Sequence, residues 1–350
     1  MPPVRLAVVG LGMAARPHFA ALAELSGTVE IAGLYARTRD KAEAAATEHG
    51  CKAFHSAEEI AQDSSIDAVL LLTPPNQRRE LVQLFAGAGK HILCEKPLER
   101  DLDAARELVE ICAGAGVTLA MVFQNRFKAG ALHLRQIMQD NALGDIALVR
   151  ATLPWWREQA YYDTPGRGTY ERDGGGVLIT QAIHLLDMML SVTGPVSAVQ
   201  ALCATTRLHD LEAEDFCSAA LIFEDGGYGS LFASTATYPS QPETLVIDGT
   251  RGTATLQGEQ LTVHWRDGVE ERIGAATPMA DGSDPMDFSC EWHRELIRDF
   301  AHSVQKRTKP MITGAEALDV HALITALMDS SKTGEKVKVP STGYVGRGTS

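Results

Sequence analysis

The sequence predicts an α/β protein with two domains: a doubly wound parallel sheet, followed by an α+β domain whose sheet is largely antiparallel. Two observations predict this. Short apolar runs alternate with helical segments over roughly the first 120 residues, and a glycine-rich turn directly follows the first run. After Phe127 the alternation stops, and strand-like runs separated by Gly- and Asp-rich turns take over. We place the two domains at residues 1–123 and 124–350.

Length and composition agree with two domains. A chain of 350 residues exceeds the usual size of a single hydrophobic core. A net charge of −13 argues against nucleic acid as a partner, because phosphate binding requires clustered positive charge. The N-terminus lacks a signal-peptide pattern, and no apolar run is long enough to span a membrane. Six scattered cysteines without a CxxC pair indicate reduced thiols, so we expect a cytoplasmic protein.

The first half contains the alternating elements. We expect strands at residues 5–9, 29–36, 68–72, 91–94 and 118–122, and helices at residues 39–48, 76–88 and 101–113. Ser56 and Glu59 have the spacing of a capping box, which predicts a short helix after Ser56.

The turn after the first strand has the pattern G-x-G-x-x-A and predicts a dinucleotide site. Gly10 allows the tight turn, and Gly12 lets the backbone approach a pyrophosphate. Ala15 permits close packing of helix on strand. Met13 lies inside the turn, and the helix that follows presents N–H groups to the phosphates. Such turns also serve as purely structural connections, so the surrounding alternation decides for the dinucleotide.

The end of the second strand predicts which nicotinamide cofactor binds. Arg37 and Thr38 lie there, and residues 36–39 include no carboxylate. An acid would bind the ribose 2′-hydroxyl of NAD, whereas an arginine accommodates a 2′-phosphate. We therefore expect NAD(P), with NADP preferred.

The loop after the strand expected at residues 68–72 should border the same cofactor. Thr73 and Pro74 begin it, and Asn76 is a good N-cap for the next helix. Ligands of such sheets lie outside the carboxyl ends of the strands.

The second half predicts strands at residues 146–153, 218–223, 229–236, 244–247, 253–257, 260–265 and 338–340, and helices at residues 128–139, 292–303 and 315–330. A further helix should begin at about Val177. It carries a narrow stripe of short polar side chains on one face, which suits a cleft, namely Thr180, His184, Asp187 and Ser191. From this stretch alone, a half-buried core histidine remains the competing interpretation.

The segment between strand and helix, residues 154–176, is dense in aromatic and arginine residues. Rings stack on sugars or aromatic rings, and arginine binds carboxylates or vicinal hydroxyls. We expect substrate contacts from Trp155, Trp156, Arg157, Tyr161 and Arg167. A structural loop or an oligomer contact is the alternative. Glu291 and His293 do not have zinc-ligand spacing on a helix face, and His321 lies in a mainly apolar pattern, so we predict no metal site.

Several motifs together resemble the family of glucose–fructose oxidoreductase and inositol dehydrogenase. They are the turn at residues 10–15, the loop at 73–76, Glu95-Lys96-Pro97, Asn125-Arg126-Phe127, and the three glycines at 174–176 followed by His184. The resemblance implies an N-terminal Rossmann domain and an open C-terminal sheet that serves oligomer contacts, as in a homodimer or homotetramer. It also implies hydride transfer between NAD(P) and a hydroxyl or carbonyl carbon of a small cyclic alcohol or ketone.

The resemblance also suggests residue roles. Lys96 and His184 match the family's catalytic lysine and histidine, and Glu95, Lys96, Asn125 and Arg126 belong to motifs expected at the cofactor. We expect His184 to accept the hydroxyl proton and Lys96 to stabilise the developing alkoxide. Lys96, Thr180 and His184 would also contact the substrate. Asp187 would orient the imidazole, and Thr180 would relay a proton or fix the substrate.

The chain departs from the family at two positions: Thr180 where an acid is frequent, and Arg78 where histidine is frequent. Three interpretations therefore remain. The first is a dehydrogenase or reductase of a sugar, inositol or sugar acid. The second is dehydrogenation of a cyclic dihydrodiol that bears carboxylates on a ring destined for aromatisation. The third is a non-catalytic protein that binds or senses NAD(P).

Overall fold

A computed structural model describes residues 1–276 and 289–343. It divides the chain into two compact units. Unit 1 comprises Met1–Glu99, Asp103–Gln124 and the described part of Asp284–Ala317. Unit 2 comprises Arg100–Leu102 and the described parts of Asn125–Ser283 and Leu318–Ser350. The chain enters unit 2 briefly at Arg100–Leu102 and again after Gln124. The expected domain boundary between residues 123 and 124 stays a prediction. The return of the chain to unit 1 near its C-terminus was not expected.

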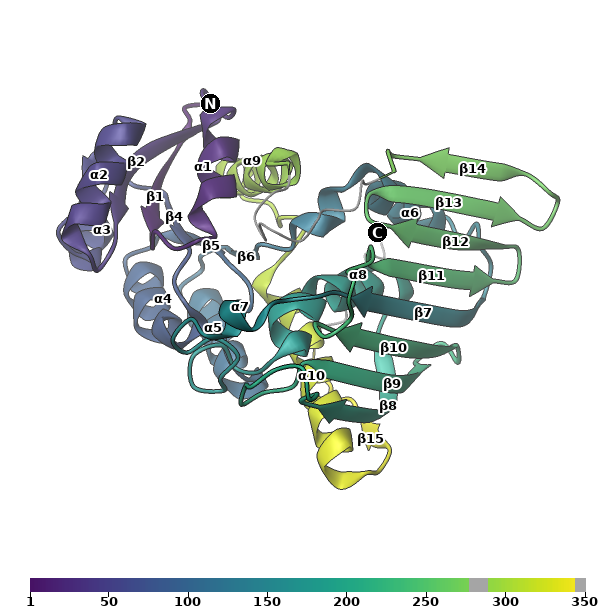
Figure 1. Cartoon of the computed structure of the whole chain (residues 1–350). Helices are drawn as coiled ribbons and strands as arrows, with labels where there is room; N and C mark the ends of the chain where they lie inside the picture. Colours follow the sequence, from purple (N-terminus) through teal and green to yellow (C-terminus); the bar gives the residue numbers. More distant parts are fainter. Residues whose placement is uncertain (277–288, 344–350) are drawn as a thin grey trace. The chain divides into compact units, whose positions relative to one another are not determined.

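Unit 1 contains the predicted parallel sheet (Figure 1). Its strand order is β3-β2-β1-β4-β5-β6, with every neighbouring pair parallel. This is the doubly wound order. Strands β2 and β3 lie on one side of β1, and β4 to β6 lie on the other side. In sheets of this order, a crevice forms at the carboxyl ends of the two central strands, here β1 and β4. The strands are β1 (Val4–Val9), β2 (Val29–Tyr35), β3 (Lys52–Ala53), β4 (Ala68–Leu71), β5 (His91–Cys94) and β6 (Leu119–Met121).

The helices of unit 1 are α1 (Ala15–Ala23), α2 (Arg39–His49), α3 (Ala57–Gln62), η1 (Pro75–Gln77), α4 (Arg78–Gly87), α5 (Leu102–Gly114) and α9 (Glu291–Lys306). The capping box is confirmed, since Ser56 Oγ accepts from Glu59 N at 3.3 Å. Helix α9 packs beside α1 and contacts β1 and β5 (Figure 1), although the sequence placed it in the second domain.

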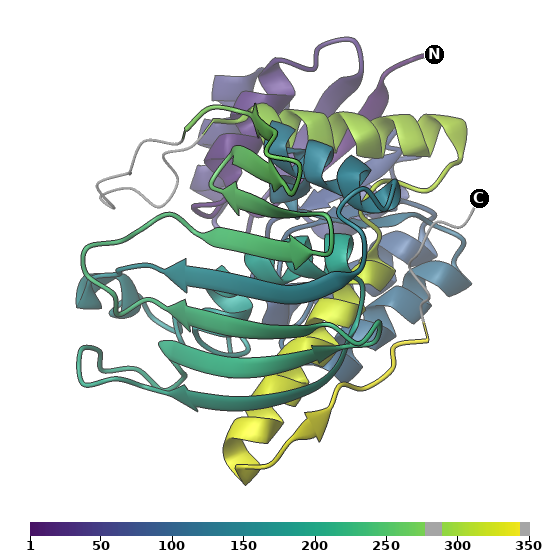
Figure 2. The ribbon, with the colours of Figure 1, turned by 90° about the vertical axis from the view of Figure 1, so that its right-hand side faces the viewer.

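Unit 2 is built on a sheet of nine strands (Figure 2), in the order β14-β13-β12-β11-β7-β10-β9-β8-β15. Neighbours are antiparallel except β7 and β10, so the largely antiparallel sheet is confirmed. Strands β8 and β14 were not predicted; β14 is a charged, exposed edge strand with little hydrophobic signal. The strands are β7 (Ile146–Pro154), β8 (Val196–Ala204), β9 (Phe216–Phe223), β10 (Tyr228–Ser234), β11 (Thr244–Gly249), β12 (Gly252–Gln257), β13 (Gln260–Trp265), β14 (Glu270–Ile273) and β15 (Val337–Lys338).

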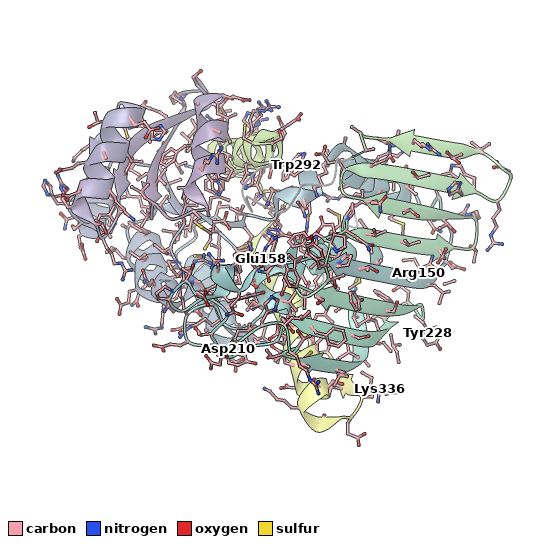
Figure 3. All side chains as sticks on the ribbon, viewed as in Figure 1. Arg150, Glu158, Asp210, Tyr228, Trp292 and Lys336 are labelled. Atoms are coloured by element: carbon pink, nitrogen blue, oxygen red, sulfur yellow. The ribbon has the colours of Figure 1, made fainter. Side chains whose placement is uncertain are left out.

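The two faces of this sheet differ. Val149 and Ala151 of β7 are buried, whereas Leu148 is 49% exposed and its registered partner Tyr228 on β10 is 61% exposed (Figure 3). The expected oligomer contact through this sheet stays a prediction. The helical segments of unit 2 are η2 (Gln124–Phe127), α6 (Ala129–Gln139), α7 (Gln159–Tyr162), the π-helical η3 (Leu178–Ala182), α8 (Ile183–Thr193) and most of α10 (Gly314–Thr333). Among the described residues, no helix is long and apolar enough to cross a membrane.

Candidate active site

The glycine turn after β1 has the geometry that a dinucleotide requires. Gly10 has φ +101°, and a Cβ there would lie 3.0 Å from backbone atoms of Leu72 and Thr73. A Cβ on Gly12 would meet nothing within 4 Å, so the space above this residue is open. Helix α1 begins at Ala15 with neither a side-chain cap nor an acid in its first turn. The turn therefore fits a pyrophosphate bound by backbone N–H groups.

An arginine lies at the end of β2, where proteins with such sheets bind the adenosine ribose. Arg37 and Thr38 are exposed, and Arg37 has no ion-pair partner among the residues that the structure describes. Arg39 is engaged elsewhere: its Nε donates to Glu43 at 2.6 Å, and Nη1 donates to the carbonyl of Phe54 at 3.2 Å. Arg37 is thus the guanidinium that remains available at this strand end.

Arg78 clamps two loops of unit 1 together. The residue is 2% exposed, and it donates to the carbonyl of Thr73 through Nη2 at 2.7 Å and Nε at 3.1 Å. Nη1 donates to the carbonyls of Pro97 and Leu98. The loop after β4 is thereby tied to the turn that carries Lys96. This explains the departure at position 78, because arginine has enough donors to hold both loops.

The buried Glu95 side chain contacts both His18 and the backbone of Lys96. One of its oxygens meets His18 Nε2 at 2.9 Å, and the other accepts from Lys96 N at 3.0 Å. Burial raises the pKa of Glu95, but the hydrogen bond and the charge of His18 outweigh burial and bring the pKa to about 2. The carboxylate therefore stays ionised and holds the Lys96 backbone. A cofactor contact from Glu95, which is 8% exposed, remains a prediction.

His293 of α9 completes this buried cluster. Its ring packs edge-on against His18 with 4.8 Å between ring centres. Burial and the charge of His18 lower the pKa of His293 to about 3. The three side chains offer ligand atoms within 4.8 Å of one another. Since both Glu95 oxygens already accept hydrogen bonds, we derive no metal site from them.

His293 should make the protein acid-sensitive. The unfolded chain protonates this imidazole near pH 6.5, whereas the folded protein does so only near pH 3, so stability falls as pH falls between these values. We expect His293→Phe to reduce the stability lost between about pH 6 and pH 5 by about 1 kcal/mol, measured by urea unfolding. The pKa of the Glu95 carboxyl is lowered from 4.5 to about 2 on folding, so this group adds little to the change in stability between pH 6 and pH 5. Exposed His55→Phe is the control, and equal slopes in the two variants would refute the assignment.

The helix that carries His184 is anchored at its start by Glu214, a residue that the sequence did not single out. Glu214 Oε2 accepts from Gly176 N at 3.1 Å, and Oε1 accepts from Leu178 N at 3.0 Å. A Cβ on Gly176 would lie 1.8 Å from the Glu214 carbonyl oxygen, which explains the glycine. Burial raises the pKa of Glu214, while these N–H groups favour its charged form.

A π-helical turn, η3, precedes His184. Thr180 Oγ1 donates to the carbonyl of Gly176 at 2.6 Å and contacts Gln181 Oε1. Such turns are frequent at functional sites, because the wider turn changes the direction of the side chains that follow. The sequence predicted a regular helix here, since the pattern of apolar residues does not distinguish a single π turn.

The expected polar stripe is only partly correct. Thr180 and His184 are half-buried, but Asp187 is completely buried, and both of its oxygens accept from Arg126, at 2.8 Å from Nε and 2.6 Å from Nη2. The structure thus pairs a residue expected to orient the imidazole with one expected at the cofactor. Because the pair is buried, it fixes η2 against α8.

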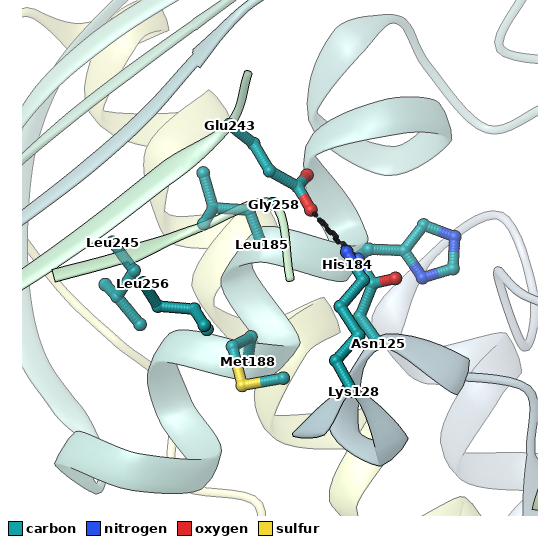
Figure 4. A pocket seen from close by; sticks show the side chains of 9 residues that line it. All are labelled: Asn125, Lys128, His184, Leu185, Met188, Glu243, Leu245, Leu256 and Gly258. Atoms are coloured by element: carbon teal, nitrogen blue, oxygen red, sulfur yellow. Dashed lines mark hydrogen bonds and ion pairs between the residues drawn. The ribbon is translucent and has the colours of Figure 1, made fainter. Parts of the chain in front are cut away.

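A small pocket lies beside His184, between α8 and the sheet (Figure 4). Lys128 pairs with Glu243 at 3.2 Å, and Asn125 Nδ2 donates to the same Glu243 oxygen at 3.2 Å. The imidazole of His184 points away from the apolar side chains Leu245 and Leu256 (Figure 4). Asn125, expected at the cofactor, therefore also helps to hold Glu243 next to the histidine helix.

The aromatic segment is joined to the end of β10 and to η3. Trp155 N donates to the carbonyl of Ser234 at 2.8 Å, and Trp156 Nε1 donates to Glu158 at 2.8 Å. Tyr161 OH accepts from Gln181 Nε2 at 3.1 Å and from Arg167 Nη1. The structure therefore places Tyr161 and Arg167 beside the turn that contains Thr180.

Comparison with known proteins shows the family of this chain. Residues 4–123 match the model of an oxidoreductase family with an NAD-binding Rossmann fold, and residues 131–255 match the GFO/IDH/MocA C-terminal domain. The chain belongs to the GFO/IDH/MocA oxidoreductase family. It is an NAD-binding oxidoreductase, and the predicted fold class is confirmed.

Similarity to individual relatives extends over most of the chain. It is 27% identical to D-apiose dehydrogenase of Paraburkholderia graminis, over 96% of this chain and 89% of that protein. It is 26% identical to myo-inositol 2-dehydrogenase of Thermotoga maritima, over 89% and 92% of the two chains. Among solved structures, the WlbA dehydrogenase from Bordetella pertussis in complex with NADH and UDP-GlcNAcA is 28% identical, with a TM-score of 0.84 and coverage of 97% and 99%.

Proposed function

We propose that this protein transfers hydride between a nicotinamide cofactor and a secondary alcohol or ketone carbon of a sugar, an inositol or a sugar acid. One observation carries the proposal: the dinucleotide turn after β1 and Lys96 after β5 follow strands of one parallel sheet at their carboxyl ends. The relatives named above, which include sugar and inositol dehydrogenases, support the same class of substrate.

In the proposed reaction the nicotinamide, when bound, supplies the hydride acceptor or donor. Lys96 stabilises the negative charge that develops on the substrate oxygen. Its backbone N–H donates to Glu95, and Arg78 donates to the carbonyl of the next residue, Pro97. His184 takes the hydroxyl proton, because an imidazole titrates near neutral pH in water. Thr180 fixes the substrate or relays a proton, and Asp187 positions α8 and with it the imidazole.

We further propose that NADP is preferred over NAD. Two features at the end of β2 support a 2′-phosphate at this position. Arg37 is exposed there, and residues 36–39 include no carboxylate.

Two other interpretations remain as second candidates. Dehydrogenation of a cyclic dihydrodiol is favoured by the cluster of rings at Trp155, Trp156 and Tyr161. It is also favoured by 27% identity to the mouse trans-1,2-dihydrobenzene-1,2-diol dehydrogenase over 73% of this chain and 74% of that one. A non-catalytic NAD(P)-binding role is favoured only by threonine at position 180.

The function is tested by assaying the reduced-nicotinamide absorbance band with both cofactors and a panel of neutral sugars, inositols, sugar acids and cyclic dihydrodiols. We expect turnover of a sugar, inositol or sugar acid, with kcat/KM at least about tenfold higher for NADP than for NAD. Turnover of dihydrodiols alone would favour the second candidate. Cofactor binding without any turnover would favour the non-catalytic role, and equal or better use of NAD would contradict the NADP proposal.

A further inference from the structure

We propose that Arg157 and Arg167 form a binding site for an oxyanion, a carboxylate or a phosphate, carried by the substrate. The inference rests on the proposed function and narrows its substrate class to anionic cyclic alcohols, with sugar acids first among them. Both guanidinium groups flank one ring: their Cζ atoms lie 5.7 Å and 4.1 Å from the centre of Tyr161. Two permanent positive charges are therefore held close together on one segment.

Neither charge is neutralised by an acid in the part of the chain that the structure describes. Within residues 1–276 and 289–343, no acidic side chain pairs with Arg157 or Arg167. Arg157 Nη1 donates to the carbonyl of Trp156 at 3.1 Å, and Arg167 Nη1 donates to Tyr161 OH. The Nε atoms of both are buried, with no hydrogen-bond partner among the described residues. A guanidinium that no acid neutralises can make charge-assisted hydrogen bonds to an oxyanion, and a bound oxyanion would compensate its charge.

Neighbouring acids are occupied elsewhere. Glu158 accepts from Trp156 Nε1 at 2.8 Å, and Asp163 accepts from Gln159 Nε2 at 3.1 Å. Asp173 accepts from Gly168 N at 3.0 Å and lies 3.8 Å from Arg172. These three acids therefore have partners other than the two arginines.

The buried group behind Arg157 does not compensate it either. His209 Nδ1 meets Asp215 Oδ2 at 2.7 Å, and His209 Nε2 meets the carbonyl of Arg157 at 2.8 Å. Asp215 also accepts from Thr206, at 2.7 Å from the backbone N and at 2.7 Å from Oγ1. These bonds hold the Arg157 backbone in place, and Asp215 makes no ion pair with the Arg157 guanidinium.

The pair is connected to the proposed chemistry by a chain of hydrogen bonds. Arg167 donates to Tyr161 OH, which also accepts from Gln181, the residue next to Thr180 on the turn before His184. Arg157 also lies over the ring of Trp155, with Cζ 5.2 Å from the ring centre. Guanidinium groups supported on aromatic faces keep an edge available for bidentate contact with a carboxylate or phosphate.

The test compares matched ligands that differ in charge. D-Glucuronate and D-glucose differ by a carboxylate in place of a CH₂OH group, and D-glucose 6-phosphate carries a phosphate at the same carbon. Binding is measured by calorimetry on the NADPH-loaded protein, and kcat/KM is measured wherever turnover occurs. The variants are Arg157→Met and Arg167→Met, with exposed Arg266→Met as the control.

We expect at least one anionic ligand to bind at least about tenfold more tightly than glucose, and each arginine variant to lose most of that advantage while glucose binding stays within about twofold. A preference for the 6-phosphate would identify the oxyanion as a phosphate, and a preference for glucuronate as a carboxylate. No anion preference, or equal losses for charged and neutral ligands, would overturn the inference. Since binding is read without turnover, failure of the proposed reaction would be recognised separately.

Discussion

Replacing Lys96 by methionine should lower kcat/KM by about two to four orders of magnitude, and His184→Asn should do the same. Both residues are proposed to act on one substrate oxygen, the lysine on its charge and the histidine on its proton. Residues that act as a unit show non-additive losses, so the double variant should be little worse than either single variant. Initial rates with the best substrate of the panel measure this.

Cofactor binding separates a chemical defect from a structural one. Fluorescence titration with NADPH should give dissociation constants within about threefold of the unmodified protein in all three variants, because backbone N–H groups of the glycine turn bind the phosphates. Lys41→Met and His264→Asn, both at exposed positions, are the controls. If either single variant kept near-normal turnover, the assignment of that residue would be wrong. Fully additive losses would argue against a shared oxygen.

Replacing Asp187 by asparagine should destabilise the protein by about 3–5 kcal/mol, because it leaves the buried guanidinium of Arg126 without its counter-charge. The two side chains are 0% and 7% exposed and are joined by two hydrogen bonds. The paired change Arg126→Met with Asp187→Leu should restore most of that loss, since apolar side chains of similar volume tolerate burial. Urea unfolding of the three variants measures these differences.

A surface ion pair in the same unit provides the matched control. Arg150 and Asp248 are 3.0 Å apart, with side chains 54% and 27% exposed (Figure 3 labels Arg150). Arg150→Met should cost less than about 1 kcal/mol, because solvent already screens this pair. A loss of this small size in Asp187→Asn would show that the Arg126 pair contributes little to stability. Failure of the paired change to recover stability would indicate that the charges have a further role.

Local patterns were sufficient for the framework of unit 1. Strand His91–Cys94, the capping box at Ser56 and the G-x-G-x-x-A turn were all predicted, because each depends on a few consecutive residues. Alternating strands and helices then imply a parallel sheet. Gly10 and Lys96 both follow strands of this sheet, so both lie at its carboxyl edge. The assignments of Lys96 and His184 to chemistry came from motif resemblance and stay proposals.

Only the tertiary structure decided which side chains meet. Arg126 and Asp187 are 61 positions apart, Gly176 and Glu214 are 38 apart, and Arg78 reaches carbonyls 19 and 20 positions away. No periodicity encodes such pairs, because they depend on how separate elements pack. The sequence by itself determined the dinucleotide turn and the two kinds of sheet. Folding decided that Asp187 faces Arg126, because long-range packing assigns a buried charge its partner. It also decided that Arg157 and Arg167 flank Tyr161 with no acid from residues 1–276 or 289–343 paired to them.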